Sequence, residues 1–335
     1  TTATGALTAT PLFNLLANHL GGSDSNAQGT TISGTASTAV LIDTVSAANL
    51  AAHSIIRVGT KGDGRGDGQA AVISSIVTNQ LTMLTATPAA PTTAGDTVFA
   101  TMQAFHDETL VSTLTTCRLG YYHNDTGNQF VLFGGQLAGL EAVYPIGNGE
   151  LPYFQFTFKG ATYERATFTF PDATALAAHD CAPIGGGSLF YNAVATATRA
   201  VLAPAELALT VSLGLEPTHA PGAPSTAAGP NSIPGWVRNA FDARLRVRVP
   251  WVNTHETLWD TANSSYTNRH ALFTGNTSAG RSVGFYAPSM FQIGKRADQP
   301  VEVNGQTFVE TSYQLTESAV TTNALTLAAL RFWFA

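Results

Sequence analysis

Charged side chains are scarce in this chain. Asp, Glu, Lys and Arg make up 11% of its 335 residues, against about 25% in ordinary globular domains. The shortage does not indicate disorder, because disordered chains combine low hydrophobicity with high net charge and 44% of this chain is hydrophobic. Free proteins use charge to stay soluble. The scarcity therefore favours a surface that is buried against neighbouring subunits. The alternative is the neutral coat of a secreted or environmentally exposed protein.

Cysteine and long apolar runs are nearly absent as well. Cys117 and Cys181 are too few for a disulfide framework and form no C-x-x-C pair. We expect free buried thiols, and a single bridge stays open. No apolar run reaches the length of about 18 residues that a membrane-spanning helix needs, so we expect no membrane insertion. The first residues lack the charged segment of a signal peptide.

The charge balance excludes a large class of partners. The chain has 16 basic and 22 acidic residues and a net charge of −6, without the basic stripe of a nucleic-acid binder. A mildly acidic protein repels phosphates. The one dense basic strip is Arg244, Arg246 and Arg248. It could contact DNA phosphates, but we expect it to pair with acidic residues of a neighbouring subunit.

The N-terminal residues predict one helix and one irregular segment. A helix is expected over residues 10–22, because Thr10 can cap it, Pro11 suits its first position and Gly21 can end it. His19 lies beside the leucine stripe of this helix, and we expect a partly buried structural histidine. Residues 22–37 are rich in Gly, Ser, Thr and Asn, which predicts an extended arm or loop.

The rest of the chain has the patterns of β-strands. Short β-branched segments separated by turn residues predict a small barrel or sandwich over residues 38–105. Strict apolar alternation then predicts sheet faces in two longer blocks. The alternating residues are Phe154, Phe156, Phe158, Leu207, Leu209, Val211, Leu213, Ala243, Leu245, Val247 and Val249. Within the second block we expect a helix over residues 254–263 and a hairpin with arms 269–274 and 281–286.

These patterns predict a mainly β protein of five segments. They are an N-terminal helix and arm (residues 1–37), a small β module (38–105), a β domain (106–215), a Pro/Gly-rich linker or long loop (216–235) and a second β domain (236–335).

The last segment resembles the tail tube proteins of long-tailed bacteriophages in its order of strand, short helix and long hairpin. Residues 149–160, Gly-Glu-Leu-Pro followed by an aromatic strand, are similar to such domains too. Residues 55–59, Ile-Ile-Arg-Val-Gly, resemble an insert in tail proteins of this kind. The resemblance covers residues 43–335. It implies two fused tube-type β-sandwich or barrel domains, each with a short helix and a long hairpin.

The resemblance also implies a function without catalysis. The protein would be a virion subunit, assembled in the host cytoplasm, whose trimeric or hexameric rings stack into a tube through which DNA passes without specific binding. Its partners would be other copies, a tape-measure protein, and terminator and baseplate proteins. Residues 22–37, 216–234 and 269–286 are the expected inter-ring contacts. The alternatives are a capsid-decorating or host-binding protein that forms a closed trimer and, less favoured, a tail-associated hydrolase.

No group of residues predicts a catalytic, cofactor or metal site. His-Asp-Cys at residues 179–181 has the residue types of a cysteine hydrolase, but adjacent side chains point apart. The histidines at 106 and 255 are followed by acidic residues, in His-Asp-Glu at 106–108 and His-Glu at 255–256. Neither group has a metal-binding spacing such as HExxH. The glycine-rich residues 61–68 lack the ending of a phosphate-binding loop and the closing Glu of a calcium loop. We therefore expect a hairpin tip there and no cofactor.

Overall fold

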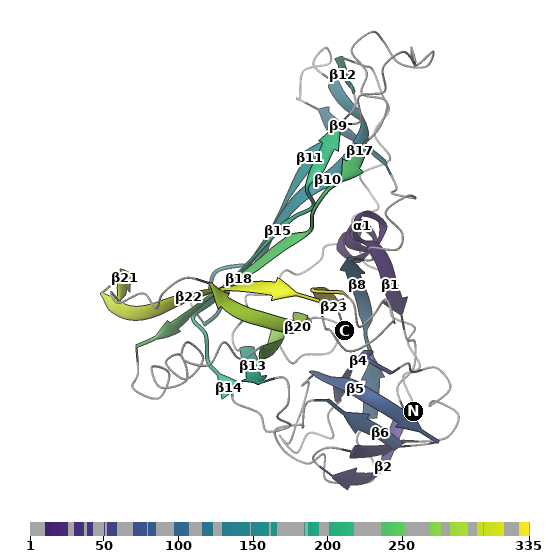
Figure 1. The fold of residues 1–335 in the computed structure, drawn as a ribbon, viewed down its shortest axis with the longest axis vertical. Coiled ribbons are helices and arrows are strands. Elements are labelled where there is room, and N and C mark those ends of the chain that lie inside the picture. The colour runs from purple at the N-terminus through teal and green to yellow at the C-terminus, as the bar shows by residue number, and fades with distance from the viewer. Residues whose placement is uncertain are drawn as a thin grey trace.

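The computed structural model describes residues 11–25, 30–36, 39–42, 50, 52–58, 70–78, 80–84, 97–106, 116–122, 129–147, 149–160, 162–165, 184, 187–193, 201–217, 236–251, 269–275, 282–293, 300–303, 305–317 and 328–334. Within these ranges the protein is mainly β, as the sequence predicts. It has one short helix, one large antiparallel sheet and smaller sheets (Figure 1). None of the described helical segments is long and apolar enough to span a bilayer.

The helix α1 (Pro11–Leu20) lies where the sequence predicts it. Gly21 ends it with a φ of 96°, a left-handed conformation that suits glycine. Its apolar face enters the main core at Leu16. His19 is more deeply buried than expected, at 3% exposure. The edge of its ring meets Phe158 of the large sheet, with 5.3 Å between the ring centroids.

This burial makes His19 a source of acid sensitivity. Burial, with the nearby Arg238 guanidinium, lowers the pKa of His19 below its ordinary value of 6.5. The unfolded chain therefore binds a proton at a higher pH than the folded chain. The stability involved is complete above pH 6.5 and is lost as the pH falls toward the folded-state pKa. We predict that the free energy of unfolding in urea falls less between about pH 7.5 and about pH 5.5 in His19→Leu than in wild type. Equal losses in both proteins would contradict this assignment.

A small closed barrel forms the lower end of the molecule in Figure 1. Its strands, in order around the barrel, are β2 (Thr30–Ala36), β3 (Ala39–Ile42), β6 (Gln80–Met83), β5 (Ala70–Val77), β4 (Ile55–Val58) and β7 (Thr97–Ala100). Buried aliphatic residues fill it, including Ile56, Ile73 and Leu81. The next strand along the chain after β7, β8 (Met102–His106), leaves the barrel and joins the large sheet.

Residues 22–25 and 30–36 form paired strands and not the extended arm or loop that their composition predicts. β1 (Gly21–Ser25) pairs with β8, and β2 pairs with β3 and β7 in the barrel. A small residue is required in β1, since a Cβ on Gly22 would lie 2.3 Å from the ring of Phe105. The prediction of a loop is therefore wrong for these strands, and their expected role in inter-ring contacts stays a prediction. The composition of this segment shows only that its side chains are small. Here the small side chains allow close packing and do not indicate a loop.

The large sheet follows the order β1-β8-β23-β20-β22-β18-β15-β10-β11. Its strands after β8 are β23 (Arg331–Phe334), β20 (Val283–Ile293), β22 (Gln306–Thr316), β18 (Asp242–Pro250), β15 (Glu206–Ser212), β10 (Gln129–Pro145) and β11 (Tyr153–Lys159). Six strands join it off this path: β9 (Cys117–Tyr122) and β12 (Thr162–Arg165) pair with β10, β19 (Arg269–Gly275) with β20, β13 (Gly187–Ala193) with β19, β14 (Val201–Leu202) with β13, and β21 (Val301–Val303) with β22.

The two predicted β domains meet inside this sheet. β15, from residues 106–215, pairs directly with β18, from residues 236–335. The two blocks also share one core. The apolar alternation read from the sequence is confirmed there. The alternating residues with at most 2% exposure are Leu207, Leu209, Val211, Leu213, Ala243, Leu245, Val247 and Val249. The five-segment division of the chain itself stays a prediction.

A second apolar cluster attaches the barrel to the large sheet. Residues of β4 and β5 pack against Tyr286 and Trp333, both almost fully buried. Arg331 is buried at the same junction, lies over the Tyr286 ring with its Cζ 4.8 Å from the centroid, and donates a hydrogen bond to the carbonyl of His53. Burial lowers the pKa of Arg331 to about 10. The guanidinium still stays charged near neutral pH.

The Pro/Gly-rich segment has its two ends side by side. β16 (Leu215–Pro217) pairs with β17 (Trp236–Arg238). Residues 218–235 between them lie outside the described residues. The pairing supports a long loop, one of the two forms that the sequence allows.

The predicted hairpin is confirmed in its arms. β19 and β20 pair antiparallel, with Gly275 opposite Val283. Every residue of β19 is buried, so an inter-ring contact of this hairpin would have to use residues outside β19, and that role stays a prediction. The tip, residues 276–281, and the expected helix over residues 254–263 lie outside the described residues.

Candidate assembly surfaces

The large sheet has a polar face that points away from the main core. β11, β10, β15, β18, β22 and β20 lie side by side there. One register row crosses all six strands through Gln155, Glu141, Thr210, Arg244, Gln314 and Phe291. Three of these six side chains are neutral and polar, two are charged with opposite signs, and Phe291 is apolar. We call this surface the open face.

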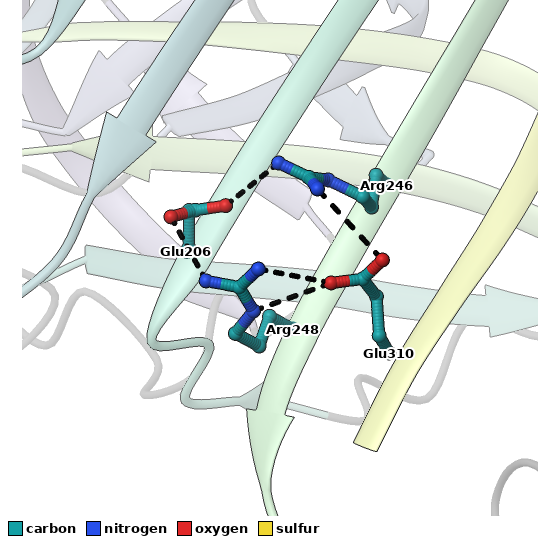
Figure 2. Close-up of polar contacts among 4 residues, drawn as sticks. All are labelled: Glu206, Arg246, Arg248 and Glu310. Carbon is teal, nitrogen blue, oxygen red and sulfur yellow. Dashed lines mark hydrogen bonds and ion pairs between the residues drawn. The ribbon is translucent and has the colours of Figure 1, made fainter. Parts of the chain in front are cut away.

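Four charged residues at one end of the open face form a paired cluster (Figure 2). Arg246 contacts both carboxylates, with Nη2 2.9 Å from Glu206 Oε1 and Nη1 3.8 Å from Glu310 Oε1. Arg248 does the same, with Nη1 3.2 Å from Glu206 Oε2 and Nη2 3.0 Å from Glu310 Oε2. The two positive and two negative charges cancel. We call these residues the charge quartet.

The charge quartet corrects the prediction for the basic strip. Arg246 and Arg248 pair with Glu206 and Glu310 of their own chain, where the sequence led us to expect acidic residues of a neighbouring subunit. Arg244 also has an intrachain partner, with Nη2 3.2 Å from Asp242 Oδ2. Exposed pairs contribute little stability. Their main effect is that the arginines of this face are already neutralised when a polyanion approaches.

We predict that removing the two carboxylates creates a DNA-binding surface. In Glu206→Gln/Glu310→Gln, Arg246 and Arg248 lose their counter-charges, while the amides keep the size of the side chains. Two phosphate contacts should give affinity for duplex DNA that weakens about tenfold between about 50 and about 200 mM salt. Filter binding or fluorescence anisotropy measures this, and wild type should show no such binding.

A matched control separates local from total charge. Glu216 and Glu317 are exposed and lie outside the six strands that form the open face, so Glu216→Gln/Glu317→Gln changes net charge equally. If this control binds DNA as well as the quartet variant does, the quartet is not what keeps the open face neutral.

The strand β11 is an edge of the sheet. Among the strands that the structure describes, only β10 pairs with it. Its three phenylalanines face the core but stay half-buried, with neighbouring ring centroids 6.2 and 6.4 Å apart. It carries one charge, at Lys159, and no proline. Apart from this lysine at its end, the seven-residue edge lacks the charges and prolines that usually protect an edge strand against pairing with another chain.

The residues singled out for chemistry are not brought together in the described part of the structure. His106 is buried at the end of β8 and stacks on Phe241, with 4.3 Å between the ring centroids. Cys117 is a half-buried free thiol, and burial raises its pKa, which makes it less reactive. No group of three or more potential metal ligands occurs among the described residues.

The other candidates cannot be placed. Residues 61–68, 107–108, 179–181 and 255–256 lie outside the described ranges.

Sequence reasoning missed two residues of the charge quartet, Glu206 and Glu310. Each lies on a strand whose alternate residues are buried, so alternation alone places them on a polar face. Their pairing with Arg246 and Arg248 requires the strand order β15-β18-β22. Nothing in the local sequence encodes that order.

Comparison with known proteins identifies no family. No protein-family model matches the chain, and no curated protein matches it. The resemblance to tail tube proteins therefore stays a prediction from the sequence, and the geometry of the sheet has to support any function.

Proposed function

We propose that this protein is the structural subunit of a bacteriophage tail tube and not an enzyme. The observation that carries the proposal is the edge strand β11, which pairs with β10 alone among the described strands and has three half-buried phenylalanines. Pairing the other side of β11 with a neighbouring copy would satisfy the backbone groups there and bury the rings. A subunit whose sheet continues into the next subunit forms a ring when the rotation closes.

The open face supports a role in lining a channel. A channel for DNA has to be hydrated and must not bind phosphates, because each unpaired cation adds salt-dependent affinity for DNA. The charge quartet is neutral as a group, and Arg244 is paired with Asp242. A lumen lined by this face would let DNA pass during ejection.

The proposal includes the finer architecture that the resemblance implies. The two β blocks would be two tube-type domains in one chain, so that three copies could build a ring that otherwise needs six. Stacked rings would form the tube in the virion after assembly in the host cytoplasm. The tape-measure protein inside, and the terminator and baseplate proteins at the ends, would be its partners.

Negative-stain electron microscopy of the concentrated protein tests this function. We expect rings or tubes with a central hole. A closed trimer that never stacks would favour a capsid-decorating or host-binding protein instead. A strictly monomeric protein at all concentrations would exclude the tube function.

A further inference from the structure

The outer part of β10 forms an arm with β9 and β12. This three-stranded arm lies at the upper end of the molecule, beyond α1 (Figure 1). One register row joins Tyr121, Phe130 and Arg165 across it, and the next row joins Leu119, Leu132 and Tyr163. Residues directly opposite each other in a sheet share a face. The arm therefore has one face of five apolar side chains and one arginine, which we call the arm face.

The arm face is an apolar surface left open. Tyr121 is 62% and Tyr163 64% exposed, although Tyr163 stacks on Phe130 with 5.3 Å between the ring centroids. The same side of β10 becomes buried after Leu132. A Cβ on Gly135 would lie 3.2 Å from the Cys117 sulfur, and Leu137 is part of the main core. The arm face therefore continues the core surface outward. Exposed apolar surface of this kind marks interaction sites.

β21 lies at another extremity of the same chain (Figure 1). The N–H of Trp251 donates to the carbonyl of Thr307, and Glu302 is the register partner of Thr307 on its other side. Trp251 and Glu302 thus flank one residue of β22. Trp251 is 37% exposed and Glu302 is exposed. We call these two residues the Trp–Glu site.

We propose that the arm face of one copy docks on the Trp–Glu site of a second copy. The aromatic rings of the arm face would cover Trp251, and Arg165 would meet Glu302. The charges have opposite sign, and Arg165 is exposed. The two surfaces differ, so the contact is head to tail and repeats without closing. This inference rests on the proposed assembly function and assigns the contact between successive rings, which the β11 edge does not provide.

The test compares self-association of full-length variants by sedimentation velocity. In the arm variant Tyr121→Ser/Tyr163→Ser, the concentration at half-association should rise about tenfold or more, since aromatic and arginine anchors dominate such contacts. Val77→Ser is the matched control, because Val77 is 66% exposed on the barrel and belongs to neither surface. It should associate like wild type.

A charge exchange tests the pairing itself. Arg165→Glu and Glu302→Arg should each weaken association, and the double variant should recover to within about threefold of wild type. The docking proposal is overturned if the arm variant associates like wild type, or if the double exchange is no better than either single change.

Micrographs of the same samples keep this result separate from the tube function. Rings that fail to stack in the arm variant support both proposals. Normal tubes in the arm variant overturn the docking proposal alone. Wild-type association that depends on the arm face but yields no ring or tube supports the docking and overturns the tube function.

Discussion

Replacing Gln155 and Thr157 with lysine should abolish ring formation and leave the subunit folded. Both side chains are exposed on the edge strand β11. A second strand pairing with this edge would have to bring its own residues directly beside two new ammonium groups. Edge lysines are a device by which natural sheets prevent such pairing. We expect the double variant to sediment as a monomer at concentrations where wild type assembles, with an unchanged thermal midpoint.

Thr210→Lys/Ser212→Lys is the matched control for charge, because it adds two lysines at exposed positions of β15. Thr157 and Ser212 flank the same residue, Gly139, in one register row of the open face. Ser212 lies on β15, whose two neighbours are β10 and β18, so it has no free edge. The control should assemble normally. Assembly of the β11 variant at wild-type concentrations, or equal loss in both proteins, would show that ring contacts do not use this edge.

The second large effect concerns stability. We expect Gly284→Ala to destabilise the fold by about 3 kcal/mol or more. Gly284 lies in β20 between β19 and β23. A Cβ there would lie 2.0 Å from the carbonyl oxygen of Phe273 and 2.6 Å from the Trp333 indole. The same carbonyl accepts a hydrogen bond from the Trp333 Nε1–H at 3.1 Å. Moving this carbonyl away from the new methyl group would therefore break the hydrogen bond that holds the indole at the barrel junction.

Gly139→Ala provides the comparison for this clash. Gly139 also lies within the sheet, but its nearest obstacle is the carbonyl oxygen of Val211 at 3.2 Å. A shift of a few tenths of an ångström relieves that contact, so the loss should stay below about 1 kcal/mol. Chemical denaturation of both variants measures the difference. A similar stability of Gly284→Ala and Gly139→Ala would mean that the β19-β20-β23 packing is looser than this structure has it.

Local patterns predicted much of the secondary structure. Pro11 and Gly21 bounded α1, since capping acts over one turn of helix. Alternation identified the buried faces of β15 and β18, since neighbouring side chains of any strand point to opposite sides. The error over residues 22–25 and 30–36, which were predicted as a loop, has the same local origin. Small polar residues read as a loop, but Gly22 is small because Phe105 packs against it.

The amino-acid sequence by itself determined a mainly β chain, its helix, its buried strand faces and its scarcity of charge, because each depends on residues close together along the chain. Only the tertiary structure decided that Arg246 and Arg248 are neutralised by Glu206 and Glu310, that β11 is an edge, and that Trp251 and Glu302 flank one residue. These features depend on strand order. Strand order is set by packing over the whole molecule, between segments far apart in sequence.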